Sequence, residues 1–147
     1  DEVLDEWYRL YLNVKNNSLE LNTFALPRTF FEEIMRSSDW EAIQLSVSDE
    51  GTKICGVIFC FKGHDNYIPM IIGIDYTYNR TFNVYRQGLY QVVLRAKQLN
   101  KSKISLGFSA SVEKQKLGAT SIPVHAYMHT VDSYNMELIS NKMALAK

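Results

Sequence analysis

Apolar side chains recur with a helical period at the start of the chain. They lie three and four residues apart between residues 1 and 14, which predicts one helix that ends near Asn16. Residues 15–28 contain Asn, Ser and Pro and predict a loop. Thr29 stands three residues before Glu32, the spacing of a capping box, and predicts the start of a second helix. Its buried side would be formed by Phe30, Phe31, Ile34 and Met35.

The period then changes to about two, which is typical of strands. Residues 40–48 and 53–62 are separated by Asp49-Glu50-Gly51 and predict an antiparallel hairpin. A second turn, over residues 63–66, leads to a third predicted strand from Tyr67 to Tyr78. Three strands in succession, joined by short turns, predict an antiparallel meander.

A helix and a further strand follow the meander. Apolar residues return to helical spacing from Val84 to Leu99, and Asn100 is a plausible stop for this helix. Residues 103–108 predict a strand. A strand, a helix and a strand in succession form a right-handed parallel crossover, so the strand at Lys103 should lie beside the third strand of the meander.

The last part of the chain predicts three short elements. Ser111–Leu117 is expected to form a helix closed by Gly118, Ile122–Thr130 a strand and Met136–Ala146 a terminal helix. The fold class is therefore α/β, of the α+β kind: a mixed, mainly antiparallel sheet with a β-α-β crossover and two N-terminal helices. We expect one domain over residues 1–147. Because the chain starts at Asp1, a fragment of a longer chain is an open alternative.

Charge and cysteine usage narrow the function classes. The 16 basic and 16 acidic residues cancel, so the chain lacks the positive field that binds nucleic acid. The apolar run Ile54–Phe61 has eight residues, and a membrane-spanning helix needs about 20. Cys55 and Cys60 lie five apart in one predicted strand and should face opposite sides, so they cannot pair. With an amino terminus unlike a signal peptide, this favours the cytoplasm.

Several short motifs resemble a known superfamily. The segments Tyr85–Tyr90, Ile104–Gly107 and Leu117–Ala119, with Ala96 and Lys114 or Lys116, resemble a "Leu-Gly … Lys … Gly" signature. This signature belongs to a branch of the GNAT N-acyltransferases related to the Fem-type peptidoglycan aminoacyl transferases. The predicted element order also resembles the GNAT fold without its first strand. The resemblance spans about residues 30 to 130.

The resemblance implies a binding site for acyl-CoA. In the superfamily, the strands matching residues 67–78 and 103–108 splay apart, and the pantetheine arm enters the gap. Helix N–H groups then bind the pyrophosphate. The usual glycine-rich loop is absent here, since no glycine lies between Asn79 and Gln87. The residues implied in cofactor binding are Ile74, Arg80, Thr81, Phe82, Asn83, Val84, Tyr85 and Arg86.

Acyl transfer from a thioester to an amine needs a base for the amine and an acid for the leaving thiolate. Asp75, near the end of the third predicted strand, is the candidate base, and a role in turn structure is the alternative. Many superfamily members have a tyrosine acid in the short helix after the crossover strand. Lys114 and Lys116 stand there instead. The resemblance implies that Lys116 stabilises negative charge, and a solvated helix face is the alternative.

A second group of residues is predicted to contact the acceptor. His125 and Tyr127 share one face of the last predicted strand with His129. The two histidines would lie about 13 Å apart, too far to share a metal ion, so no metal site is predicted. The predicted substrate contacts are Tyr76, Tyr78, Ser109, His125 and Tyr127.

Three functions are compatible with these features. The first is an N-acyltransferase that takes the acyl group of acetyl-CoA or another acyl-CoA to an amine on a small molecule or a cell-envelope precursor. The second is a non-catalytic GNAT-like accessory domain of a larger enzyme, which the altered loop favours. The third is a Fem-type tRNA-dependent aminoacyl transferase, which the net charge of zero disfavours. An exposed sheet edge also predicts a homodimer or a covalently linked partner domain.

Overall fold

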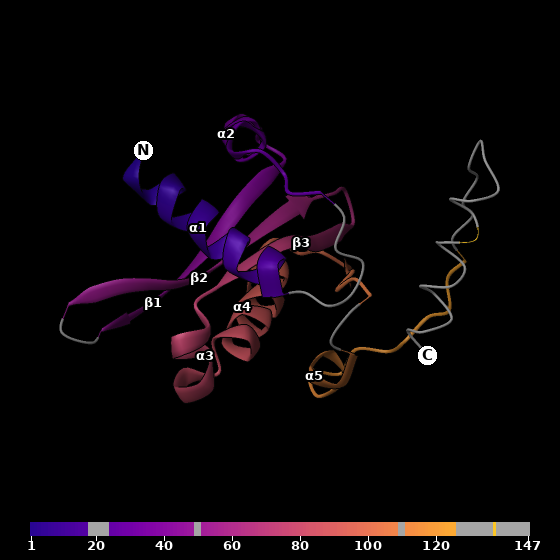
Figure 1. The fold of residues 1–147 in the computed structure, drawn as a ribbon. Helices are drawn as coiled ribbons and strands as arrows, with labels where there is room; N and C mark the ends of the chain where they lie inside the picture. The colour runs from indigo at the N-terminus through magenta and orange to yellow at the C-terminus, as the bar shows by residue number, and fades with distance from the viewer. Residues whose placement is uncertain (18–23, 49–50, 109–110, 126–136, 138–147) are drawn as a thin grey trace.

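A computed structural model describes residues 1–17, 24–48, 51–108, 111–125 and 137. Two helices precede the sheet, two follow its third strand, and one follows its fourth (Figure 1). The elements are α1 (Glu2–Asn17), α2 (Arg28–Arg36), β1 (Trp40–Ser48), β2 (Thr52–Lys62), β3 (Asn66–Ile74), α3 (Tyr76–Phe82), α4 (Val84–Gln98), β4 (Lys103–Ile104) and α5 (Ser111–Gln115).

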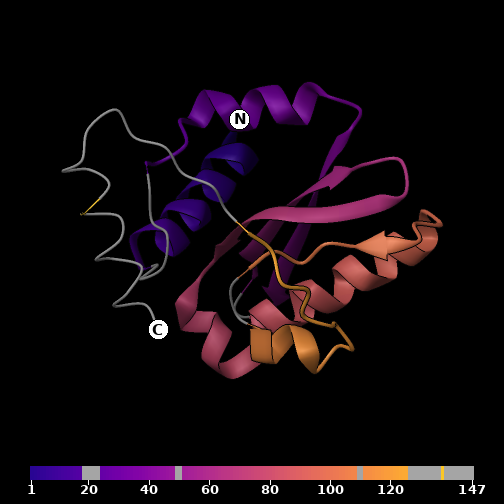
Figure 2. The ribbon, with the colours of Figure 1, turned by 90° about the vertical axis from the view of Figure 1, so that its right-hand side faces the viewer.

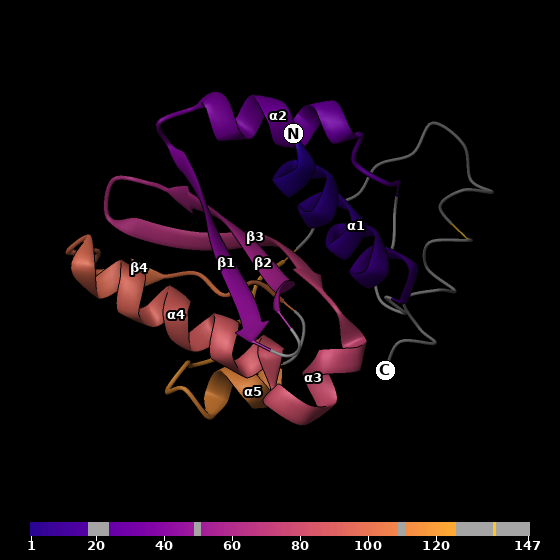
Figure 3. The same ribbon diagram turned by 90° about the vertical axis from the view of Figure 1, so that its left-hand side faces the viewer.

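The four strands form one mixed sheet in the order β1-β2-β3-β4. β1 pairs with β2 and β2 with β3 in antiparallel fashion, whereas β3 and β4 are parallel. Figure 3 shows α1 and α2 on one face of the sheet and α4 on the other. The predicted fold class is confirmed, including the meander and the β3-α4-β4 crossover.

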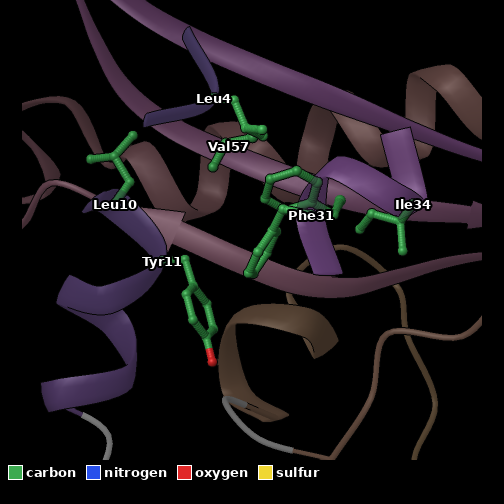
Figure 4. Close-up of a cluster of buried hydrophobic side chains, with 7 residues drawn as sticks. Leu4, Leu10, Tyr11, Phe31, Ile34 and Val57 are labelled. Atoms are coloured by element: carbon green, nitrogen blue, oxygen red, sulfur yellow. The ribbon is translucent and has the colours of Figure 1, made fainter. Parts of the chain in front are cut away.

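One half of the core lies between the sheet and the first two helices (Figure 4). Aromatic rings dominate it: Phe31 is fully buried and its ring centroid lies 4.9 Å from that of Tyr11 and 5.0 Å from that of Phe59. The Tyr11 hydroxyl accepts a hydrogen bond from the N–H of Leu26, which ties the segment before α2 to α1. Burial of these large apolar surfaces is the main force that holds α1 and α2 on the sheet.

The other half of the core lies under α4. Ile58, Cys60 and Tyr67 of the sheet pack against Val92 and Ala96 of the helix. Cys55 belongs to a separate cluster and is also buried, so both cysteines lie in the core, and they are unpaired as predicted. Burial raises the pKa of the Cys60 thiol to about 12, which keeps it protonated and unreactive.

A glycine sets the distance between α1 and the sheet. A Cβ atom on Gly73 would lie 2.6 Å from the backbone nitrogen of Tyr11 and 2.7 Å from the carbonyl carbon of Leu10. No side chain fits there, so the backbone of α1 rests directly on β3. This contact fixes α1 over the carboxyl end of β3, beside the candidate site.

A polar network of Glu41, Tyr67 and Arg95 joins β1, β3 and α4. The Glu41 carboxylate accepts a bond of 2.6 Å from the Tyr67 hydroxyl and two from the Arg95 guanidinium, of 2.9 and 2.8 Å. Bonds from Arg95, followed by the bond from Tyr67, hold the pKa of Glu41 below its ordinary value of 4.5. The network therefore fixes α4 relative to the first strand of the sheet.

Most predicted boundaries agree with the structure, and four do not. Thr29 does not cap α2; the helix begins at Arg28 after Pro27, whose fixed φ suits the entry to a helix. The third strand ends at Ile74 and not at Tyr78, and the fourth ends at Ile104 and not at Phe108. Residues 122–125 form no strand, while residues 126–130 and almost all of the predicted terminal helix lie outside the described residues.

Substitution of Glu41 by Gln should lower the free energy of unfolding by about 1–2 kcal/mol, since it removes the charge from three hydrogen bonds at a half-exposed site. The pKa of Glu41 is depressed, so this contribution is present above pH 4.5 and is lost as the pH falls below it. Chemical denaturation at pH 7 and pH 3 measures the effect. The control is Glu33→Gln in an exposed pair with Arg36, and an equal loss in both variants at pH 7 would contradict the network's role.

Substitution of Gly73 by Ala should cost about 3 kcal/mol, because the new methyl group meets the rigid backbone of α1. The comparison variant is Gly88→Ala. There the new Cβ would meet the terminal methyl of Ile58, which can move, and alanine is the better helix former by about 1 kcal/mol. Denaturant titration should show a larger loss of stability for Gly73→Ala than for Gly88→Ala. Unchanged stability of Gly73→Ala would contradict the direct contact of α1 with β3.

Candidate functional site

The parallel pairing of β3 with β4 stops after two residue pairs, Asn66 with Lys103 and Tyr67 with Ile104. A last bond runs from the N–H of Ser105 to the carbonyl of Tyr67, with a length of 3.1 Å. The next bond of a parallel ladder would be donated by residue 69. That residue is Pro69, which has no N–H, so the ladder cannot continue and the strands separate.

Backbone groups of β3 line the gap that opens beyond Pro69. The N–H of Asp75 bonds the carbonyl of Cys55 on β2 at 2.9 Å. Groups alternate along a strand, so the N–H and carbonyl of Ile74 and Ile72 point away from β2, toward the gap. The carbonyl of Ile74 accepts a bond of 3.4 Å from the side-chain amide of Asn13 on α1. The gap thus presents peptide groups that a ligand with amide bonds can pair with.

Asp75 ends β3 and starts α3. Its Oδ1 accepts a bond of 3.0 Å from the N–H of Thr77, which makes it the N-cap of the helix, and its Oδ2 lies 3.4 Å from the guanidinium of Arg9 on α1. The Asp-x-Thr sequence is thus a cap, where the run of β-formers had predicted continued strand. α3 carries Tyr76, Tyr78 and Phe82, and the rings of Tyr78 and Phe82 stack with their centroids 6.3 Å apart.

Helix α4 begins where the resemblance places the phosphate-binding loop. Asn83 has a left-handed φ of 51° and joins α3 to α4. The side-chain oxygen of Asn79 accepts a bond of 2.9 Å from the N–H of Tyr85. One of the free N–H groups at the start of α4 is therefore already satisfied by the protein. In place of a glycine loop, the chain has a helix turn and an asparagine cap.

Helix α5 is held against the start of α4 by charge. The carboxylate of Glu113 lies 2.8 Å from the guanidinium of Arg86 on α4 and 2.7 Å from the Nζ of Lys116. Bonds from Lys116 and from Arg86 hold the pKa of Glu113 low. Figure 2 shows α5 beside the first turn of α4, in agreement with this pairing. Tyr85 packs on the cluster around Ile74, and its pKa is raised by burial and by the charge of Glu113.

Lys114 differs from every other residue of α5, because it alone in this helix is buried, with 7% of its surface exposed. Its Nζ lies 4.0 Å from the position that a Cβ on Gly107 would occupy. Gly107 has a φ of 75° and turns the chain from β4 toward α5. Desolvation lowers the pKa of Lys114, and within the described residues its ammonium has no hydrogen bond or ion pair.

The structure brings together most of the residues predicted for the site. Ile74 and Asp75 at the end of β3, the residues of α3 and the first turn of α4 follow one another in the chain, and the pairing of Glu113 with Arg86 brings α5 to the start of α4. Lys116 is exposed and bonded to Glu113. The sequence-based choice therefore fell on the less buried of the two lysines, Lys114 and Lys116. Arg80 is exposed in the last turn of α3. His125 is exposed too, while Ser109 and Tyr127 lie outside the described residues.

Asn79 was missed, and Lys116 was chosen over Lys114, because the positions of both side chains depend on tertiary contacts. Asn79 is three residues from the end of α3, and nothing local indicates that its side chain caps the following helix. Lys114 lies in a polar stretch, Glu113-Lys114-Gln115-Lys116, that is typical of a solvated helix face. Only the position of Gly107 and the pairing of Arg86 with Glu113 reveal which lysine turns inward.

Other features of the described residues lie elsewhere. A hollow of about 430 Å³ lies near the carboxyl end of α4 and is lined by residues that include Lys97, Asn100 and Lys101. Within the described ranges, no group of three His, Cys, Asp or Glu side chains could hold a metal ion. No helix there has the length and apolarity needed to cross a bilayer.

Comparisons with known proteins agree with this geometry. The family described as "Acetyltransferase (GNAT) domain" matches residues 1–115. No curated protein sequence matches the chain. Among solved structures, the tetramutant of the BH1408 protein from Bacillus halodurans superposes with a TM-score of 0.67 at 14% identity, over 88% of this chain and 95% of that one.

Two antibiotic-modifying enzymes are also similar in fold. The aminoglycoside 6'-N-acetyltransferase AAC(6')-IG from Acinetobacter haemolyticus has a TM-score of 0.58 at 11% identity and covers 90% of this chain and 95% of its own. The aminoglycoside acetyltransferase meta-AAC0020 from an uncultured soil metagenomic sample, in complex with sisomicin, has a TM-score of 0.60 at 10% identity. The match covers 88% of this chain and 89% of that one. At such identities the likeness establishes the fold.

Asp75 can be tested for its two roles separately. Replacement by Ala removes the cap of α3 and should cost about 1 kcal/mol of stability, whereas Asn keeps a capping oxygen and should restore most of it. If Asp75 is also the base of an acyl transfer, Asn should lower kcat by about 100-fold or more at unchanged stability. Thermal denaturation and steady-state kinetics of both variants separate the roles, and an Asn variant with full kcat would leave Asp75 a cap alone.

Proposed function

This chain belongs to the GNAT acetyltransferase domain family, and we propose that it is an N-acyltransferase that moves the acyl group of acetyl-CoA or another acyl-CoA to an amine. The observation that supports the proposal best is the gap between β3 and β4, where the backbone groups of Ile72 and Ile74 have no strand partner and only the Ile74 carbonyl is engaged, by the side chain of Asn13. The pantetheine arm of CoA is a chain of amides and matches such an edge in the way that an added strand does. The proposed acceptor is an amine on a small molecule or a cell-envelope precursor.

The two ends of the proposed donor fit the site unequally. The amide arm has an open strand edge to pair with. The pyrophosphate has fewer free partners, because the side chain of Asn79 already accepts the N–H of Tyr85 and Glu113 is already paired with Arg86. Arg80 is exposed on the last turn of α3, and no ion pair involves it within the described residues. We therefore assign the phosphate contact to Arg80 and to the remaining N–H groups at the start of α4.

The site residues support direct attack of the amine on the thioester. Backbone groups at the edge of β3 orient the carbonyl, so that proximity supplies much of the rate. Asp75 stays the candidate base, and its bonds to Thr77 and Arg9 hold the carboxylate in one orientation. Tyr76 and Tyr78 of α3 would border the acceptor. The Fem-type relationship and a cytoplasmic location remain predictions from the sequence.

A non-catalytic accessory domain is the second candidate. It is favoured by one observation, the replacement of the glycine loop by α3 and the Asn79 cap, which closes part of the phosphate site. Such a domain would keep the fold and need not bind CoA. Pairing through an open sheet edge, with a second copy or a linked domain, is proposed for either function.

Titration of the protein with acetyl-CoA should show saturable binding by calorimetry, and ligand at 100 times its Kd should stabilise the fold by about 2.7 kcal/mol. Arg80→Ala should weaken CoA binding about tenfold and leave acetyl-pantetheine, which has no phosphate, unaffected. The control is Arg36→Ala, an exposed arginine on α2.

The outcomes separate the two candidates. Binding of both ligands, with the loss in Arg80→Ala confined to CoA, supports the acyltransferase and the assigned phosphate contact. Binding of neither ligand at millimolar concentration would contradict the acyltransferase and support the accessory domain. An equal loss of both ligands in Arg80→Ala would overturn the phosphate contact alone.

A further inference from the structure

One face of α1 carries three polar residues that meet the carboxyl end of β3. Glu6, Arg9 and Asn13 lie three and four positions apart, which is the spacing of a single helical face. Arg9 contacts the carboxylate of Asp75, and Asn13 donates to the last carbonyl of β3. The polar face of α1 therefore borders the residue that is proposed as the base.

The guanidinium of Arg9 is held mainly by Glu6. Its Nε and Nη2 donate bonds of 2.8 and 2.7 Å to the two oxygens of the Glu6 carboxylate. The same Nη2 lies 3.4 Å from Oδ2 of Asp75. Bonds from Arg9 hold the pKa of Glu6 below its ordinary value of 4.5, and both of its oxygens are engaged. Glu6 thus fixes Arg9 and is itself a poor acceptor for a further proton.

The two carboxylate oxygens of Asp75 have different contacts. Oδ1 accepts the N–H of Thr77 and caps α3, whereas Oδ2 faces Arg9. Contacts at both oxygens restrict the rotation of the carboxylate. Because a carboxylate oxygen can accept two bonds, Oδ2 can still receive a proton from a ligand beside Arg9. Oδ2 is therefore the oxygen of Asp75 that is suited to act as a base.

We infer that Arg9 is a positioning residue, which holds Oδ2 of Asp75 in the orientation in which it takes a proton from the attacking amine. The inference rests on the proposed acyltransferase function, with Asp75 as the base. A base that is oriented by a third group is a recurring arrangement in enzymes.

The proposed reaction balances without a proton from Arg9, whose guanidinium stays charged. The amine nitrogen attacks the thioester carbon, a C–N bond forms, and one proton passes from this nitrogen to Oδ2 of Asp75. The C–S bond breaks with its electron pair on sulfur, which leaves as the thiolate of CoA and takes a proton from water. Arg9 acts only through the position of the carboxylate.

The chain contains a matched ion pair that touches no candidate base. Glu33 and Arg36 on α2 have the same spacing as Glu6 and Arg9, and both are exposed. An exposed pair of this kind adds little to stability. If Arg9 had a structural role alone, Arg9→Ala and Arg36→Ala should therefore behave alike.

The first test needs no ligand. If Arg9 holds the carboxylate of Asp75, then Arg9→Ala should free this carboxylate to rotate and weaken its bond to the N–H of Thr77. Hydrogen exchange of the Thr77 amide, followed by NMR, should become about threefold faster. Arg36→Ala should leave the exchange rate unchanged. An equal rate in Arg9→Ala and in the unaltered protein would overturn the inference.

The second test follows the release of CoA thiol from acetyl-CoA with three primary amines as probes: spermidine, glucosamine and a lysine dipeptide. Arg9→Ala should lower kcat about tenfold and leave the KM for acetyl-CoA and the melting temperature unchanged. In the Asp75→Asn background the same substitution should have no further effect on kcat, because the base is already absent. Guanidinium ion at millimolar concentration should restore part of the rate of Arg9→Ala, and Arg36→Ala should match the unaltered protein.

The outcomes separate this inference from the proposed function. A loss of kcat in Arg9→Ala that disappears in the Asp75→Asn background, together with faster exchange at Thr77, supports the inference. An equal loss of kcat in both backgrounds overturns it and leaves the acyltransferase proposal intact, as does full kcat in Asp75→Asn. A protein that neither binds acetyl-CoA nor acetylates any of the amines overturns the acyltransferase proposal and the inference together.

Discussion

Because Pro69 cannot donate a hydrogen bond, β3 and β4 separate and leave the gap on which the proposed function depends. β3 and β4 can pair only as far as Tyr67, because the next donor of the parallel ladder has no N–H. The two strands then diverge, and the peptide groups of Ile72 and Ile74 are left without a strand partner. Everything proposed about ligand binding depends on this open edge. Gly73, which lies between these two residues, brings α1 against β3 and holds the edge in place from one face.

The elements around the gap are fixed by polar contacts more than by burial. Asp75 caps α3 and reaches Arg9 of α1, Asn79 caps α4, and Glu113 joins α5 to Arg86. These contacts are exposed or half-buried, so each is weaker than the contacts of the apolar core and of the Glu41 network. The site therefore consists of weakly held short helices on a strongly held sheet, an arrangement common to ligand-binding regions.

Periodicity alone predicted α1, the meander, α4 and the parallel crossover, because each buries a long apolar stripe. It failed where one side chain outweighs the local pattern. Tyr76 to Tyr78 have strand propensity, but the cap at Asp75 turns them into helix. The fourth strand was predicted as too long, since its pairing is limited by a proline on another strand. The inward position of Lys114 depends on Gly107 and Arg86, which no local pattern relates to it.

The central claim is that the open edge of β3 receives the donor, and NMR of the backbone amides during titration with CoA tests it most directly. Addition of CoA should shift the amide resonances of Ile72, Ile74 and Gly107 first and most, in a saturable manner. Shifts confined to the hollow near Lys97 and Lys101, or no shifts at millimolar CoA, would contradict the account.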